Sequence, residues 1–239
     1  MGRDSALLAV VVGAVDYGAA DRIVRLLSAE EGRSAVMARR ARSARSRHAG
    51  LDVGSLVGVQ MRQGRGRLPY VTGVDPVRLP RRARTDLDRL ALLAYGCELC
   101  AALAPEHHEA PRLFGLLDTW LQLLEEEGTP GPASRVALEA KALTFAGLAP
   151  QLVICARCGE PLEDPAVFDP EAGGGVHARC GGGKSVPVRL LHAIEALRRT
   201  PTAQSIGYAL APEGWWLLSD FTQHQLAKPL KSRPLLEGL

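Results

Sequence analysis

The chain has 239 residues, of which 46% are hydrophobic and 23% are charged. This composition excludes an intrinsically disordered chain, and the longest apolar run, residues 6–12, is far shorter than the roughly 20 residues that span a bilayer. We therefore expect a globular, cytoplasmic protein with no membrane partner.

Charge is distributed unevenly along the chain. Residues 1–84 hold 16 Arg, no Lys and 7 Asp or Glu, a net charge of +9, whereas residues 85–239 hold 13 Lys or Arg and 19 Asp or Glu, a net charge of −6. A genome that favours arginine codons explains the choice of arginine over lysine but not this split. The first third of the chain therefore suits a polyanion, because a guanidinium group can donate two hydrogen bonds to one phosphate.

Five short strands are predicted before residue 80. They are expected at residues 5–12, 22–27, 34–38, 56–62 and 68–74. Glu31-Gly32 is a turn signal, and the glycine-rich residues 63–67 are typical of a hairpin tip. Residues 21–31 also suit a helix. Short strands separated by turns favour a small barrel, and we expect an OB-like β-barrel domain over residues 1–80.

The pattern changes from strands to helices at residues 80–84. Thr85 is the predicted N-cap of a first helix, in which Leu87 and Leu90 begin a series of leucines at helical spacing. Further helices are expected after Pro111, over about 133–146, over 188–199 and from Ser219 onward. These leucine-rich stripes predict one helical domain over residues 81–239, so the expected fold class is α+β.

The strongest chemical signal is a pair of short motifs with metal-ligand spacing. Cys155 and Cys158 are separated by two residues, as are His177 and Cys180, and 18 residues lie between the two motifs. Four such ligands match the tetrahedral preference of Zn²⁺, and a closed ligand set predicts a structural site. We expect residues 154–181 to be a zinc knuckle inserted in the helical domain, a loop that the metal closes. Reduced cysteines without metal, or a Cys155–Cys158 redox pair, are the alternatives.

A second pair of cysteines, Cys97 and Cys100, lies within the first predicted helix. Helical geometry does not form a metal knuckle, and a buried free cysteine behaves as a small apolar residue. We therefore expect core packing here. The chain offers no convincing set of nucleophile, base and orienting group, so we expect a protein that is not an enzyme.

Arginines concentrate directly after the third predicted strand and at the predicted hairpin tip. The candidate DNA-binding residues are Arg39, Arg40, Arg42, Arg45, Arg47, Arg62, Arg65 and Arg67. Such a set can contact phosphates without reading sequence, although a solvated or protein-binding loop is the alternative. Tyr17 and Tyr70 are the aromatic candidates for base stacking, so we expect electrostatics to dominate.

In their order and spacing, these features resemble the RecO family of recombination and repair mediators. The similar segments are residues 15–24, the Glu31-Gly32 turn, the basic stretch 38–47, the zinc segment 155–180 and the closing stretches 221–226 and 230–236. The family pattern has four cysteines in the zinc segment. This chain has His177 as the third ligand, and imidazole is an acceptable Zn²⁺ ligand.

The resemblance implies a non-enzymatic, nucleoid-associated protein with an N-terminal OB-fold and a helical C-terminal domain. It implies binding to single- and double-stranded DNA, annealing of complementary strands, and partnership with RecR and single-stranded DNA-binding protein to load the recombinase.

The acidic C-terminal tail of single-stranded DNA-binding protein is an expected ligand of the helical domain. Lys228, Lys231 and Arg233 are candidate contacts, and a solvated helix face is the alternative. A different function, that of a zinc-ribbon transcription-associated DNA-binding factor, is the second hypothesis. A factor that reads a DNA sequence should have a recognition helix, and none of the predicted helices is basic along one face. A zinc hydrolase is the third, and the closed ligand set disfavours it.

Overall fold

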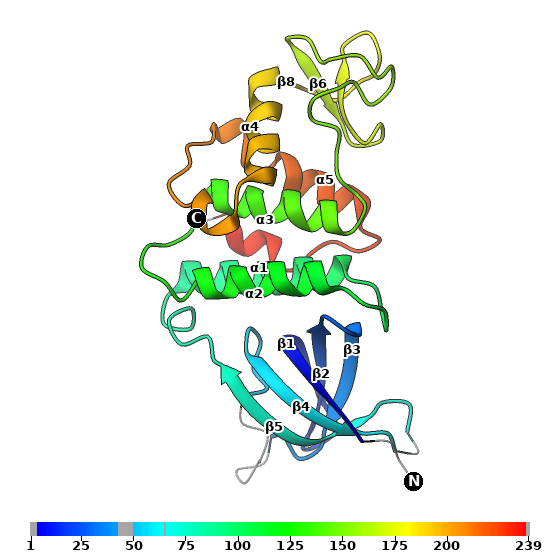
Figure 1. Cartoon of the computed structure of the whole chain (residues 1–239), viewed down its shortest axis with the longest axis vertical. Coiled ribbons are helices and arrows are strands. Elements are labelled where there is room, and N and C mark those ends of the chain that lie inside the picture. The colour runs from blue at the N-terminus through cyan, green and yellow to red at the C-terminus, as the bar shows by residue number, and fades with distance from the viewer. Residues whose placement is uncertain (1–3, 43–49, 65, 238–239) are drawn as a thin grey trace. The chain divides into compact units, whose positions relative to one another are not determined.

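A computed structural model describes residues 4–42, 50–64 and 66–237, which form two units (Figure 1). The barrel unit comprises Met1–Glu127 together with Pro234–Leu236, and the cysteine unit comprises Gly128–Arg233 and Glu237–Leu239. The first two helices are therefore grouped with the barrel, although the chain changes from strands to helices near residue 80.

The described part of residues 4–78 forms a closed five-stranded barrel. Its strands are β1 (Asp4–Tyr17), β2 (Asp21–Ser28), β3 (Gly32–Ala38), β4 (Leu56–Arg62) and β5 (Tyr70–Arg78), in the order β1-β2-β3-β5-β4. The five predicted strands are confirmed, and the helical alternative for residues 21–31 is wrong. Buried side chains alternate with partly exposed ones along β3, which is the period of two expected of a strand with one face on the core.

A bulge in β1 allows one long strand to serve both neighbours. The first part of β1 pairs with β4 and the second with β2, and the register shifts between Val11 and Gly13. A bulge bends a strand and increases its twist, which a closed barrel requires. The barrel closes where Met37 of β3 pairs with Tyr70 of β5.

The barrel unit also contains α1 (Leu87–Leu103) and α2 (Pro111–Leu123). The predicted cap of α1 is wrong: Asp86 is the N-cap and accepts a hydrogen bond from the Arg89 amide at 3.0 Å, whereas the Thr85 hydroxyl donates to the Arg82 carbonyl. The core role expected of Leu87 and Leu90 is also wrong, because 81% of Leu87 and 41% of Leu90 are exposed. Leu87 is the first residue of α1, and the buried residues of this helix begin two positions later, at Arg89.

The core between α1 and α2 is built on a close approach at Gly96. A Cβ atom added there would lie 2.5 Å from the Trp120 indole, whose Nε1 donates to the Leu92 carbonyl at 3.1 Å. Cys97 and Cys100 are buried in α1, so their predicted core position is confirmed. Burial raises the pKa of Cys97 to about 12 and also raises that of Cys100, so both remain neutral thiols.

The cysteine unit combines helices with a small sheet. Its elements are α3 (Pro132–Phe145), β6 (Ala166–Asp169), β7 (Gly174–His177), β8 (Lys184–Val186), α4 (Val188–Arg199) and α5 (Leu217–Gln225), with 3-10 turns at Thr202–Ser205 and Pro212–Gly214. A third 3-10 turn, Arg233–Leu236, belongs to the barrel unit except for Arg233. The expectation of a simple loop over residues 154–181 is wrong, because β6 and β7 form an antiparallel pair flanked by β8. Phe168 of β6 is buried and contacts Phe221 of α5 edge-on, with ring centroids 5.7 Å apart.

Among the described residues, we find no helix that combines the length and apolar character needed to cross a bilayer.

Candidate metal centre and basic barrel surface

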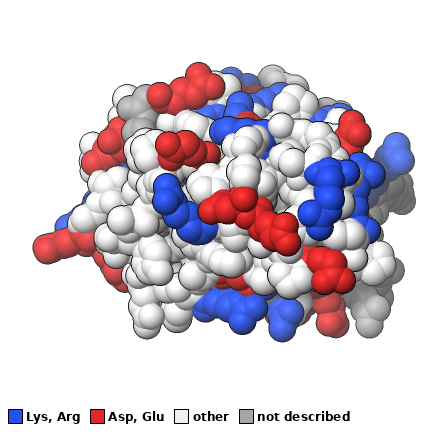
Figure 2. All heavy atoms as spheres, turned by 90° about the horizontal axis from the view of Figure 1, so that it is seen from above, with Lys and Arg blue, Asp and Glu red and all other residues white. Residues whose placement is uncertain are grey.

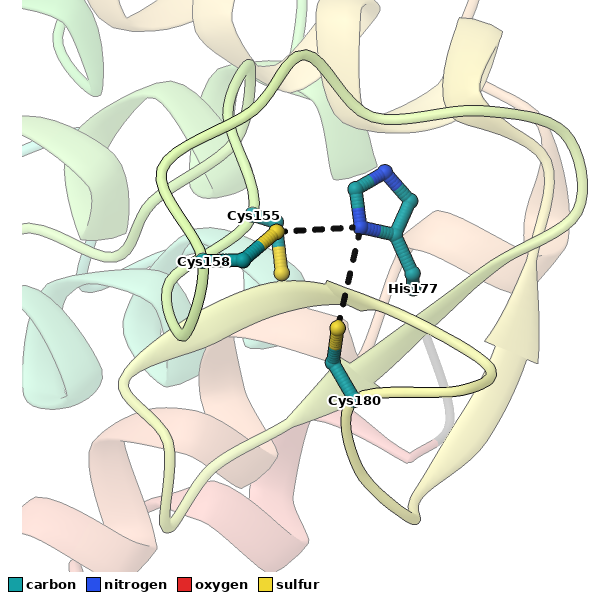
Figure 3. A group of neighbouring side chains, drawn as sticks. All are labelled: Cys155, Cys158, His177 and Cys180. Carbon is teal, nitrogen blue, oxygen red and sulfur yellow. Dashed lines mark hydrogen bonds between the residues drawn. The ribbon is translucent and has the colours of Figure 1, made fainter.

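Four side chains from two separate turns converge in the cysteine unit (Figure 3). One potential ligand atom each from Cys155, Cys158, His177 and Cys180 lies within 4.8 Å of all the others. Nδ1 of His177 lies 3.4 Å from the Cys158 sulfur and 3.9 Å from the Cys180 sulfur. The structure therefore brings together the four residues that the spacing predicted.

Backbone hydrogen bonds shape the two turns that present these ligands. The Gly159 amide donates to the Cys155 carbonyl at 2.9 Å, and Gly159 has a φ of +80°, which favours glycine. In the second turn, the Cys180 amide donates to the His177 carbonyl at 2.8 Å. The sequence motif of two residues between ligands thus corresponds to two tight turns.

The β6–β7 hairpin sets the position of the first turn relative to the second. Gln151 donates from its amide to the Gly173 carbonyl at 3.0 Å and accepts from the Gly175 amide at 2.8 Å. A Cβ atom at Gly174 would lie 2.4 Å from the Gln151 carbonyl oxygen, so glycine is required for this approach. The segment that leads to Cys155 is therefore held beside β7, the strand that ends at His177.

The imidazole of His177 is oriented by a backbone carbonyl. Its Nε2 lies 2.9 Å from the Pro161 carbonyl oxygen, which can only accept a hydrogen bond. Nε2 is therefore the donor in this contact, and Nδ1 is the ring nitrogen that faces the Cys158 and Cys180 sulfurs. A hydrogen bond of this kind to the remote nitrogen is common in metal-binding histidines.

The sulfur atoms differ in their electrostatic surroundings. Burial opposes ionisation of Cys155, but hydrogen bonds from the backbone amides of Cys158, His177 and Arg157 lower its pKa to about 6. Burial and the neighbouring thiols raise the pKa of Cys180. One thiolate is favoured and further negative charge is opposed, so a bound cation would stabilise the full set. Three sulfurs and one imidazole nitrogen form a donor set that fits a closed tetrahedral metal site.

Three arginines of the barrel unit lie immediately after β3, and all are exposed. The Arg39 guanidinium lies 4.6 Å from the centroid of the Tyr70 ring. Arg40 has a φ of 54°, and its amide donates to the Asp21 carboxylate at 2.8 Å. Arg42 forms an ion pair with Asp16 at 3.3 Å.

Two further arginines belong to the adjacent β4–β5 hairpin. Arg62 at the end of β4 pairs with Tyr70 at the start of β5, and Arg67 lies between these strands; both arginines are exposed. We call Arg39, Arg40, Arg42, Arg62 and Arg67 the arginine cluster. Arg45, Arg47 and Arg65 lie outside the described residues.

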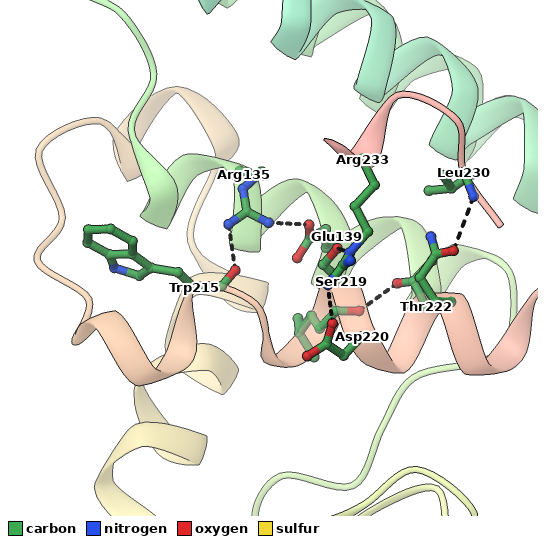
Figure 4. A network of polar contacts seen from close by, with 10 residues as sticks. Arg135, Glu139, Trp215, Ser219, Asp220, Thr222, Leu230 and Arg233 are labelled. Carbon is green, nitrogen blue, oxygen red and sulfur yellow. Dashed lines mark hydrogen bonds and ion pairs between the residues drawn. The ribbon is translucent and has the colours of Figure 1, made fainter. Parts of the chain in front are cut away.

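A polar network in the cysteine unit engages one of the three cations assigned to partner binding (Figure 4). Arg233 forms an ion pair with Asp220, donates to the Ser219 hydroxyl at 3.0 Å and lies 5.4 Å from the Trp216 ring centroid. Lys228 and Lys231 are exposed. Sequence reasoning missed this role of Arg233 because its partners lie 13 and 14 residues away, beyond the reach of any helical spacing.

A buried ion pair in the same network was also missed. Arg135 and Glu139 lie four residues apart on α3, with an N–O distance of 2.8 Å, and Arg135 also donates to the Trp215 carbonyl at 2.6 Å. The spacing of four residues is visible in the sequence, but it is equally common on exposed helix faces.

We call residues 154–181 the metal segment. Both this segment and α4 contain cationic and acidic residues. Figure 2 shows Lys and Arg interspersed with Asp and Glu on the face seen from above. The excess of arginine lies within residues 1–84, which contain the five strands of the barrel, so the barrel is a better candidate for a polyanion than the helices are.

Two family models match consecutive parts of the chain. The model described as Recombination protein O N terminal matches residues 5–80, and the model described as Recombination protein O C terminal matches residues 84–234. The chain belongs to the RecO family. The resemblance inferred from the sequence is therefore confirmed, and the two matches meet between β5 and α1.

RecO proteins of several bacteria are similar to this one over almost their whole length. DNA repair protein RecO of Anaeromyxobacter sp. (strain K) is 37% identical over 246 residues, which cover 98% of this chain and 96% of the relative. RecO of Myxococcus xanthus (strain DK1622) is 36% identical, with coverage of 94% and 93%. RecO of Syntrophotalea carbinolica (strain DSM 2380 / NBRC 103641 / GraBd1) is 34% identical, with coverage of 97% and 93%. This RecO protein is thus a member of a DNA repair family.

Proposed function

We propose that this RecO protein is a recombination mediator that binds single- and double-stranded DNA without sequence specificity and anneals complementary strands. In this proposal it acts with RecR on DNA coated by single-stranded DNA-binding protein and helps to load the recombinase. Membership of a DNA repair family supports the general role, and it disfavours a transcription-associated factor.

The observation that carries the proposal is the arginine cluster at one end of the barrel. Pairing of Met37 with Tyr70 brings the residues after β3 beside the β4–β5 hairpin, so arginines from two separate segments share one surface. Neutralising phosphates on two strands reduces their mutual repulsion, and contacts to phosphates alone do not select a sequence. Both properties suit the annealing of arbitrary complementary strands.

Annealing of complementary strands coated with single-stranded DNA-binding protein tests this function. Replacing Arg39, Arg40 and Arg42 by alanine should slow annealing and weaken binding to any sequence alike. Each lost phosphate contact should lower the slope of log K against log salt by about 0.7 on single strands.

A matched control removes the same charge from the cysteine unit. Arg179, Arg189 and Arg199 are exposed, and their replacement by alanine should leave the salt slope unchanged. Equal losses in both triple variants would indicate a general effect of net charge and exclude the arginine cluster as the DNA site.

We also propose that the tail of single-stranded DNA-binding protein contacts Lys228, Lys231 and Arg233. The two exposed lysines are the sharper test, because charge reversal at Arg233 would also break its contacts with Asp220 and Ser219. Lys228→Glu with Lys231→Glu should weaken binding of a tail peptide in a fluorescence anisotropy titration. Unchanged affinity would exclude both lysines.

The metal of the Cys155, Cys158, His177 and Cys180 centre is, in our proposal, one structural Zn²⁺ ion. The donor set supports it, because thiolate and imidazole ligands in a closed tetrahedral arrangement are those that structural zinc prefers. Its role would be to hold the turns of the metal segment together.

A further inference from the structure

An apolar row crosses the outer face of the barrel over four strands. Val15 of β1 pairs with Ile23 of β2, Ile23 pairs with Met37 of β3, and Met37 pairs with Tyr70 of β5. Directly paired residues on neighbouring strands project from the same face of a sheet. These four side chains, which we call the apolar row, therefore lie side by side.

The apolar row faces outward rather than into the barrel core. Val24 and Val36, which neighbour Ile23 and Met37 in sequence, are fully buried, so the side chains of the row lie on the opposite face. Val15 is 50% exposed, and the other three members are half-buried. Four neighbouring apolar side chains on the outer face of a sheet form a surface suited to an apolar ligand.

Cations border the apolar row on both sides. Arg25 is exposed two residues beyond Ile23 and therefore projects from the same face of β2. At the other border, Arg39 lies over the Tyr70 ring, and Arg62 pairs with Tyr70. The acidic side chains nearby are already engaged: Asp16 binds Arg22 and Arg42, and Asp21 accepts from the Arg40 amide.

We propose that the apolar row contacts the bases of single-stranded DNA while the bordering arginines hold its phosphates. The inference rests on the proposed DNA-binding function and adds a base-dependent part to it. Neighbouring strands are about 4.8 Å apart, so the row is roughly 14 Å long and spans a few nucleotides. In a duplex the bases are paired and stacked inside, so an apolar surface of this kind fits unpaired bases better.

Two oligonucleotides with the same charge separate base contacts from phosphate contacts. One is an oligothymidylate, and the other is an abasic strand of equal length. Ile23→Thr with Met37→Thr places a β-branched residue, which suits a strand, at both positions and leaves Tyr70 and Arg39 unchanged. This double variant should lose about tenfold in affinity for oligothymidylate, with its affinity for the abasic strand and its salt slope unchanged.

The matched control carries the same kind of change elsewhere on the barrel. Leu8 of β1 and Val77 of β5 are exposed apolar residues outside the row. Leu8→Thr with Val77→Thr should leave the affinity for both oligonucleotides unchanged. An equal loss for this control would show that the effect is a general one on the barrel and would overturn the proposal.

A spectroscopic measurement tests the unmodified protein. The chain has three methionines, of which Met37 lies in the row and Met61 is 3% exposed in the barrel core. With methyl-labelled methionine, oligothymidylate should shift the Met37 resonance and leave that of Met61 in place, whereas the abasic strand should shift neither. A Met37 resonance that does not respond to oligothymidylate would overturn the proposal.

The outcomes distinguish this inference from the proposed function. If the unmodified protein binds both oligonucleotides equally, and replacement of Arg39, Arg40 and Arg42 weakens both, the DNA-binding function stands and the base contacts do not. If it binds neither at low salt, the proposed function itself fails.

Discussion

At the scale of single residues, Lys141 couples the stability of the cysteine unit to pH. Its ammonium group donates to the Leu197 carbonyl, near the end of α4, at 2.9 Å. Burial first, and the charge of Arg198 second, lower the pKa of Lys141 from 10.5 to about 8. The fold therefore disfavours the protonated form of this side chain.

We expect the contribution of Lys141 to stability to rise with pH. Between about pH 8 and pH 10.5 the unfolded chain holds a proton that the folded protein has released, so the free energy of unfolding increases. Denaturant unfolding at several pH values measures this for the unmodified protein and for Lys141→Met. The free energy of unfolding of the unmodified protein, minus that of the variant, should increase over this pH range. A difference that is constant or falls over this range would contradict the assignment.

The metal ligands give a second prediction at this scale. Purified protein, kept reduced and free of chelators, should contain one equivalent of zinc, and Cys158→Ser should lower this content. Cys97→Ala and Cys100→Ala should leave it unchanged, because burial keeps both thiols protonated. Metal analysis that finds well below one equivalent in the unmodified protein would argue against the zinc site.

At the scale of elements, the connection from β5 to α1 is held by the end of α2. Glu125 follows α2, and its carboxylate accepts hydrogen bonds from three consecutive amides, those of Arg81, Arg82 and Ala83, at 2.9 to 3.1 Å. From α1, Arg89 donates to the Leu124 carbonyl at 2.5 Å. These contacts, all within the barrel unit, tie the connection and both helices together.

Glu125→Ala should lower the free energy of unfolding by about 2 kcal/mol, because it leaves three backbone amides without their charged acceptor. Glu127→Ala, two residues further along the chain and exposed, is the matched control and should change stability by less than about 0.5 kcal/mol. Equal effects of the two variants on the denaturation midpoint would show that the three hydrogen bonds contribute little.

At the scale of the whole molecule, the two functions proposed for the chain lie in different units. The arginine cluster belongs to the barrel unit, and the four metal ligands belong to the cysteine unit. Residues 1–84 carry a net charge of +9 without any contribution from the metal segment. Binding of phosphates should therefore depend little on the metal.

Removing the metal should separate stability from DNA binding. Chelation should lower the melting temperature, because ligation no longer holds the two turns of the metal segment together. Buried apolar residues such as Phe168 and Val176 should keep part of the segment folded, so the loss should be partial. The salt slope of DNA binding should persist, and its collapse on chelation would indicate that the metal segment contributes to the DNA site.

The sequence by itself determined the features that depend on local patterns. Short apolar runs separated by turn residues predicted the strands of the barrel, and the spacing of Cys155, Cys158, His177 and Cys180 predicted a ligand set that converges in space. The helix at Val188–Arg199 was predicted with its observed bounds. Each of these signals lies within one short segment of the chain or, for the metal ligands, in two short motifs with the same spacing.

The tertiary structure decided what depends on residues distant in the chain. Three examples are the exposure of Leu87, the ion pair of Arg233 with Asp220, and the β6–β7 hairpin. Each depends on which surfaces come into contact in the fold, and the periodicity of a short sequence segment does not contain that information. The apolar row required the register of four strands. A shift of one residue in that register would move every side chain of a strand to the other face, so only the pairing itself placed Ile23 beside Met37.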